Sequence, residues 1–297
     1  MQKGKLTKDT IVVAGQERSY VYYIPSDYDE KTPLPLLFSF HGATSNAEHH
    51  SRLTQFHKLA ETEKFFVLYP ESTHVDPANP AAKQWNEGVD GNPAKAANVD
   101  DVGFIAELLE QWKQKYHVNK NKIFTTGFSN GSGFSLRLAI DLPNTFTGVG
   151  GVAGPLPIVF SNKVENMPPL VFIMGDADPV IPFTAADAAG EKKYFIYDLL
   201  GARKTAEAFA YGSFDVTDIQ TERLPTVLLE DPTRVDRTKF LDKQERARVT
   251  FYTVKGGGHT WPGGPKLQPP AANGAVSQQL DATRVIWDTL SNLTSPK

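Results

Sequence analysis

Short runs of consecutive apolar residues recur along the chain, and segments with helical spacing lie between them. The runs that read as strands are residues 36–40, 65–69, 123–126, 169–174 and 249–254. A strand without polar alternation is typical of a sheet that is covered on both faces. The intervening segments place apolar residues three and four apart, at 51–63, after Asp100-Asp101, after Gly133 and around Leu280 to Leu290. This alternation predicts an α/β fold with a mostly parallel central sheet and helices on both faces.

Two parts of the chain depart from the alternation. Residues 10–14 and 17–24 flank Gly15-Gln16 and predict an antiparallel N-terminal hairpin at the edge of the sheet. Residues 183–247 carry mixed signals, and we expect either a cap-like insertion over a cleft or a helical pair packed on the sheet. No linker interrupts the pattern, so residues 1–297 are predicted to form one domain.

Composition removes several classes of function. The net charge is -3, so no basic face for nucleic acid is expected. The chain has no cysteine, which excludes disulfides, thiolate catalysis and cysteine-ligated metals. No apolar run approaches the roughly 20 residues that span a membrane, so no membrane partner is expected. Residues 1–7 are basic, but no apolar segment follows them, so no signal peptide is expected.

Gly127-Phe128-Ser129-Asn130-Gly131 is the stretch with the clearest chemistry. It follows the strand 123–126 and precedes a helix, which is the context of a nucleophile elbow. The flanking glycines allow a sharp turn with close backbone approach. The pattern alone is equally compatible with a turn in which Ser129 is an ordinary N-cap of the helix.

Four predicted strands end in residues that together support the nucleophile elbow. These ends are His41-Gly42-Ala43, Ser129, Asp178 and His259. In open α/β sheets, ligands bind beyond the carboxyl ends of the strands. The order nucleophile, acid, histidine is that of α/β-hydrolases. Asp176, two residues before Asp178, remains the rival acid.

The same motifs carry a resemblance to a known family. The stretches concerned are His41-Gly42-Ala43-Thr44, Gln84-Trp85-Asn86-Glu87-Gly88, Val99-Asp100-Asp101-Val102-Gly103-Phe104, the serine motif, Gly175-Asp176-Ala177-Asp178-Pro179-Val180, and Gly256-Gly257-Gly258-His259-Thr260-Trp261-Pro262-Gly263-Gly264. From about residue 10 to 290 the chain resembles the polyhydroxybutyrate depolymerase-like and feruloyl esterases. The resemblance implies an α/β-hydrolase fold with Ser129 as nucleophile, His259 as general base and acid, and Asp178 as orienting carboxylate. A serine hydroxyl needs such an imidazole, and the imidazole needs such a carboxylate.

The resemblance implies a serine carboxylesterase that acts through an acyl-enzyme. The expected substrates are feruloyl, other aryl or acetyl esters of plant polysaccharide, with a polyhydroxyalkanoate or another polyester as the alternative. A catalytically silent binding protein of the same fold is less favoured, since the three residues are intact, and a peptidase would need a gating domain. We expect an extracellular enzyme whose leader has been removed, with the cytoplasm as the alternative.

The oxyanion hole is expected from backbone amides. One is that of Asn130, directly after the nucleophile, and the other is that of Ala43, with Thr44 as the alternative. Trp85, Trp261 and Thr44 are predicted to contact the substrate, although each tryptophan is equally compatible with packing its own loop. We expect no cofactor and no metal, because nothing completes a site around His49-His50.

Overall fold

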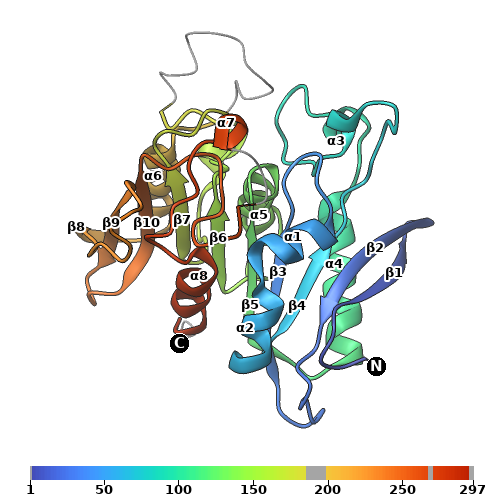
Figure 1. Cartoon of the computed structure of the whole chain (residues 1–297). Coiled ribbons are helices and arrows are strands. Elements are labelled where there is room, and N and C mark those ends of the chain that lie inside the picture. The colour runs from blue at the N-terminus through green and yellow to red at the C-terminus, as the bar shows by residue number, and fades with distance from the viewer. Residues whose placement is uncertain (1, 185–198, 267–269, 294–297) are drawn as a thin grey trace.

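The computed structural model describes residues 2–184, 199–266 and 270–293, and in them the chain forms a ten-stranded sheet (Figure 1). Its order is β1-β2-β4-β3-β5-β6-β7-β10-β9-β8. The strands are β1 Thr7–Val13, β2 Gln16–Tyr23, β3 Leu34–Phe40, β4 Phe66–Pro70, β5 Val118–Gly127, β6 Gly148–Val152, β7 Leu170–Gly175, β8 Val216–Arg223, β9 Arg234–Asp242 and β10 Ala247–Lys255.

The middle of the sheet is parallel and both edges are antiparallel. Strands β4, β3, β5, β6, β7 and β10 pair in parallel, whereas β1, β2, β9 and β8 join through antiparallel pairings. The predicted parallel sheet and the N-terminal hairpin are therefore confirmed. In the register of β3 and β5, Phe40 lies beside Gly127. The loops that begin at His41 and Phe128 thus leave the sheet from adjacent positions.

Helices cover both faces of the sheet. They are α1 Ala47–Thr54, α2 Phe56–Glu63, α3 Pro93–Ala96, α4 Asp101–Lys115, α5 Asn130–Asp141, α6 Ala202–Ser213, α7 Pro270–Asn273 and α8 Ala282–Ser291, with 3-10 turns at Pro80–Ala82 and Ile158–Lys163. Helices α1, α2 and α8 pack on one face, and α4, α5 and α6 pack on the other (Figure 1). In the described part of the chain no helix is long and apolar enough to cross a membrane.

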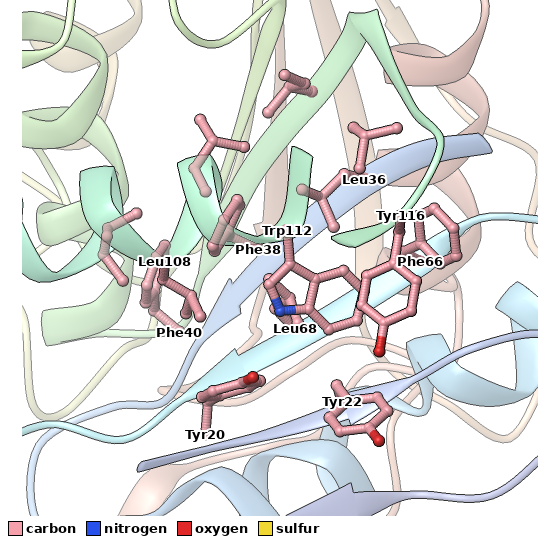
Figure 2. Packing of buried hydrophobic residues seen from close by; sticks show 14 of the residues in the cluster. Tyr20, Tyr22, Leu36, Phe38, Phe40, Phe66, Leu68, Leu108, Trp112 and Tyr116 are labelled. Carbon is pink, nitrogen blue, oxygen red and sulfur yellow. The ribbon is translucent and has the colours of Figure 1, made fainter. Parts of the chain in front are cut away.

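Aromatic side chains join α4 to the sheet. Trp112 of α4 contacts Tyr22 of β2, at 5.4 Å between ring centroids, and Tyr116, at 4.4 Å (Figure 2). Phe66 of β4 packs edge-on against the same indole at 5.7 Å. All four rings are buried. Because Asp100 caps α4 by accepting the Gly103 amide at 2.8 Å, the helix begins where the acidic pair predicted it to begin.

Two segments differ from the sequence prediction. The helix expected over 51–63 is two helices, because Gln55 adopts a left-handed conformation with φ 54°. Within the insertion, residues 202–242 form α6 and the antiparallel strands β8 and β9, which extend the sheet beyond β10. Of the cap-like insertion expected over residues 183–247, residues 185–198 lie outside the described residues, so a cap in that part stays a prediction.

Candidate active site

Ser129 sits in a strained turn between β5 and α5. Its φ is 54° and its ψ is -126°, a conformation that non-glycine residues rarely adopt. A Cβ on Gly127 would lie 2.1 Å from the carbonyl oxygen of Gly131, and one on Gly131 would lie 2.4 Å from that of Phe40. Neither position therefore has room for a side chain, which supports the nucleophile elbow over an ordinary N-cap.

The imidazole of His259 joins Ser129 to Asp178. Its Nε2 lies 2.9 Å from Ser129 Oγ, and its Nδ1 lies 2.7 Å from Asp178 Oδ2. The carboxylate favours the tautomer with the proton on Nδ1, which leaves the lone pair of Nε2 facing the hydroxyl. The loop after β10 holds the ring in place, since the His259 amide donates to the Asn273 carbonyl at 2.6 Å. The geometry is that of a serine, histidine and acid triad.

The structure separates the two candidate acids. Asp178 Oδ1 accepts the amides of Val180 and Ile181, each at 2.8 Å, so its Oδ2 is aimed at the histidine. Asp176 instead accepts the amide of Gly256 at 2.7 Å and lies 3.1 Å from Lys255 Nζ. Only Asp178 is in contact with His259, so the residue preferred from sequence is the one that the structure brings to the histidine.

Two residues that line the cavity carry candidate oxyanion donors. Ala43 and Asn130 line one cavity with Ser129 and His259, and neither backbone amide donates a hydrogen bond to another described residue. The amide of Thr44, the alternative donor, already donates to the carbonyl of Lys83 at 2.9 Å. The arrangement therefore favours Ala43 and Asn130 as the oxyanion donors.

His41 orients the peptide that carries the Ala43 amide. Its Nε2 accepts the Ser72 amide at 3.1 Å, so its Nδ1 carries the proton and donates to the Gly42 carbonyl at 2.7 Å. The Gly42 carbonyl and the Ala43 amide belong to one planar peptide unit, so fixing one fixes the other. The sequence placed His41 at a strand end but did not indicate this role, which depends on the loop around Ser72.

The serine opens into a cavity of about 620 Å³. Thr44, Ser45, Asn46, Gln84 and Glu87 give it polar walls, and Phe128, Val180, Ile181 and Leu199 give it apolar ones. Phe128 packs against His259 at 5.0 Å between ring centroids. Within the described residues no group of three histidine, aspartate or glutamate side chains is placed to hold a metal ion.

Comparison with known proteins identifies the family. Residues 18–193, more than half of the chain, match the family described as Esterase PHB depolymerase. The chain belongs to this family. The match contains Ser129 and Asp178 and ends before His259.

Relatives of this esterase family extend the match. "Putative esterase NocK" of Nocardia uniformis subsp. tsuyamanensis is 29% identical over 294 residues, which cover 96% of this chain and 82% of that protein. "Probable feruloyl esterase C" of Aspergillus niger is 28% identical over 183 residues, which cover 59% of this chain and 60% of that protein.

A solved structure confirms the α/β-hydrolase fold. The acetyl xylan esterase from Aspergillus awamori superposes with a TM-score of 0.58 at 14% identity, covering 86% of this chain and 94% of that one. At this identity the likeness concerns the fold alone.

The prediction that Trp85 and Trp261 line the cleft of this esterase is wrong. Trp85 is fully buried, stacks on Phe134 at 5.0 Å and donates from its indole nitrogen to the His41 carbonyl at 3.0 Å. Trp261 is 1% exposed and donates to Thr283 Oγ1 at 3.0 Å. Both rings pack their own loops, which was the alternative, and of the three residues only Thr44 lines the cavity.

The side chain of Asn130 has a second role that the sequence did not indicate. Its Oδ1 accepts the Trp85 amide at 2.7 Å, and its Nδ2 donates to the Trp85 carbonyl at 3.0 Å. This pair of hydrogen bonds fastens the long loop between β4 and α4 to the first turn of α5. The residue after the nucleophile thus presents an amide to the cavity and fixes one of its walls.

Proposed function

We propose that this protein is a serine carboxylesterase that hydrolyses its substrate through an acyl-enzyme. The observation that carries the proposal is the hydrogen-bonded series Asp178, His259, Ser129. It opens into a cavity that is also lined by Ala43 and Asn130, whose backbone amides donate to no other described residue. Family membership supports an ester substrate. The strained backbone at Ser129 is the further feature expected of a nucleophile on an elbow.

In the proposed mechanism each of these groups has a role. His259 Nε2 removes the proton of Ser129 Oγ as the oxygen attacks the ester carbonyl. The amides of Ala43 and Asn130 stabilise the negative oxygen of the tetrahedral intermediate, and loss of one such donor typically costs about 3–4 kcal/mol. The imidazolium, stabilised by Asp178, then gives its proton to the leaving alcohol. Water then attacks the acyl-enzyme through the same series of steps, and the carboxylic acid is released.

The substrates we favour are feruloyl, other aryl or acetyl esters of plant polysaccharide. The cavity of about 620 Å³ has the size of a site for one small organic group, and Phe128 offers it an aromatic surface. The feruloyl esterase among the similar proteins supports this choice. An extracellular location goes with the proposal, since polysaccharide is met outside the cell.

A polyester is the second candidate, because the family takes its name from a polyhydroxybutyrate depolymerase. We would compare initial rates on methyl ferulate, acetylated xylan, hydroxybutyrate oligomers and an aromatic polyester. The favoured proposal predicts the highest kcat/KM on one of the first two. A higher kcat/KM on the hydroxybutyrate oligomers or on the aromatic polyester would instead support a polyester substrate.

The control for the reaction itself is hydrolysis of p-nitrophenyl acetate by wild type and Ser129→Ala. We expect the variant to lose at least 1,000-fold in kcat, since only the oxyanion hole and binding remain. Equal rates for the two proteins would refute the serine mechanism and leave a silent binding protein as the better description.

A further inference from the structure

Glu87 is a carboxyl group in the cavity that the mechanism above does not use. It lies in the loop between β4 and α4, and its side chain is partly buried and lines the cavity with Ser129 and Asn130. A Cβ placed on Gly133 would lie 2.3 Å from Glu87 Oε2. The carboxyl therefore occupies the space above the first turn of α5 that a side chain at position 133 would fill.

The surrounding amides give this carboxyl little support as an anion. Asn92 and Asn130 are its neighbours, and Asn92 Nδ2 already donates to Gln84 Oε1 at 3.1 Å and to the Trp85 carbonyl at 2.9 Å. Asn130 Nδ2 donates one hydrogen to the Trp85 carbonyl, so a single N–H remains for Glu87. The Oδ1 atoms of both amides accept backbone amides. Both amide oxygens are therefore already engaged as acceptors.

Charged groups on the adjoining elements are engaged elsewhere. Lys95 donates to the Gly88 carbonyl and to Asp90, and Arg137 of α5 donates to the Asn86 carbonyl and to Asp141. Arg18 and Asp101 form a buried ion pair with each other at 2.6 Å. Burial raises the pKa of the Glu87 carboxyl to about 8, against the smaller lowering effect of the two amides. Below that pH the group is a neutral hydrogen-bond donor.

The neighbours of Glu87 favour contact with the acyl half of the ester. The leaving oxygen must face His259 Nε2, from which it receives its proton. Glu87 lies instead against Asn130 and the first turn of α5, and Asn130 provides the oxyanion donor. We propose that Glu87 is a substrate-recognition residue of the acyl side, whose carboxylic acid donates a hydrogen bond to an oxygen atom carried by the acyl group. This inference rests on the proposed esterase function and deepens it, since it predicts selection of oxygen-bearing acyl groups over plain alkyl ones.

Two isosteric substrates test the proposal. p-Nitrophenyl methoxyacetate differs from p-nitrophenyl butyrate by an ether oxygen in place of a methylene, so the ratio of their kcat/KM values reports the acceptor. Relative to wild type at pH 6.5, we expect Glu87→Leu to lower this ratio about 3- to 10-fold, the effect of one neutral hydrogen bond. Glu87→Gln, whose amide also donates, should keep the ratio within threefold. Glu110→Gln on the exposed face of α4 is the matched control and should leave the ratio unchanged.

The pH dependence gives a readout that a purely structural role would not produce. Between pH 6 and 9 the wild-type ratio should fall as the acid becomes a carboxylate, which can only accept, whereas the ratio of Glu87→Gln should stay flat. A flat wild-type ratio, or an unchanged ratio in Glu87→Leu, would overturn the proposal. If Glu87→Leu fails to fold, the comparison of wild type with Glu87→Gln across pH decides alone. Hydrolysis of p-nitrophenyl butyrate by wild type and Ser129→Ala distinguishes failure of the Glu87 proposal from failure of the esterase proposal. Equal rates for these two proteins would refute the esterase function itself.

Discussion

Replacing Asp178 with asparagine should disable the protein through the tautomer of His259. Asp178 Oδ1 accepts two backbone amides at 2.8 Å, from Val180 and Ile181. An asparagine keeps those two hydrogen bonds only if its oxygen takes that place, and its NH₂ group then faces His259 Nδ1. The imidazole must accept there, so its proton moves to Nε2, where Ser129 requires a base.

The expected loss follows from this reversal. An asparagine that locks the wrong tautomer of a triad histidine lowers kcat by about 10,000-fold, or about 5.4 kcal/mol of transition-state stabilisation. The side chain keeps its volume and its two backbone partners, so we expect little change in the unfolding temperature. The loss should appear in kcat, with a smaller change in KM.

The assay is the initial rate on p-nitrophenyl acetate at pH 7.5, with thermal unfolding measured on the same samples. Asp176→Asn is the matched control, because Asp176 bonds to Gly256 and not to the histidine. It should retain activity within about threefold of wild type. An Asp178→Asn variant within tenfold of wild type, or an equal loss in Asp176→Asn, would refute the assignment of the acid.

Three further predictions concern the surroundings of the serine. His41→Ala should lower kcat on p-nitrophenyl acetate by about 10- to 100-fold, because the Gly42 carbonyl loses its hydrogen-bond donor. His41→Asn should recover part of the lost kcat. Equal rates in wild type, His41→Ala and His41→Asn would contradict this role. Gly131→Ala should lower the unfolding free energy by about 1–3 kcal/mol or more in urea titrations, since its Cβ would lie 2.4 Å from the Phe40 carbonyl oxygen. The Glu87 carboxyl has a pKa of about 8 in the native state and about 4.5 in the unfolded chain. As pH rises from 4.5 to 8, the free energy of unfolding of wild type should therefore fall relative to that of Glu87→Gln, by at most about 5 kcal/mol. Parallel curves of stability against pH for the two proteins would count against a raised pKa.

The parallel core of the fold could be predicted because buried strands leave an unambiguous pattern. Residues 36–40, apart from Ser39, and residues 169–174 are apolar throughout, since helices cover both faces of these strands. The triad could be predicted as well, because its three members follow strand ends that one edge of a parallel sheet must bring together. Their contacts are present in the structure, whereas their catalytic roles stay predictions.

The cavity walls could not be predicted in the same way. A tryptophan in a loop looks alike in sequence whether its ring faces a ligand or the core, and the core positions of Trp85 and Trp261 depend on Phe134 and Thr283, remote in sequence. The second role of Asn130 likewise needs the Trp85 backbone beside it. The break at Gln55 escaped prediction because apolar spacing continues through it, while the left-handed turn is a property of the backbone.

Covalent labelling tests the central claim most directly. Incubation with an alkyl fluorophosphonate, followed by mass measurement of the intact protein and of its peptides, should show a single adduct located on Ser129. The same treatment of Ser129→Ala should leave the mass unchanged, because the nucleophilic hydroxyl is absent. An active protein that acquires no adduct, or an adduct that persists in Ser129→Ala, would contradict the account.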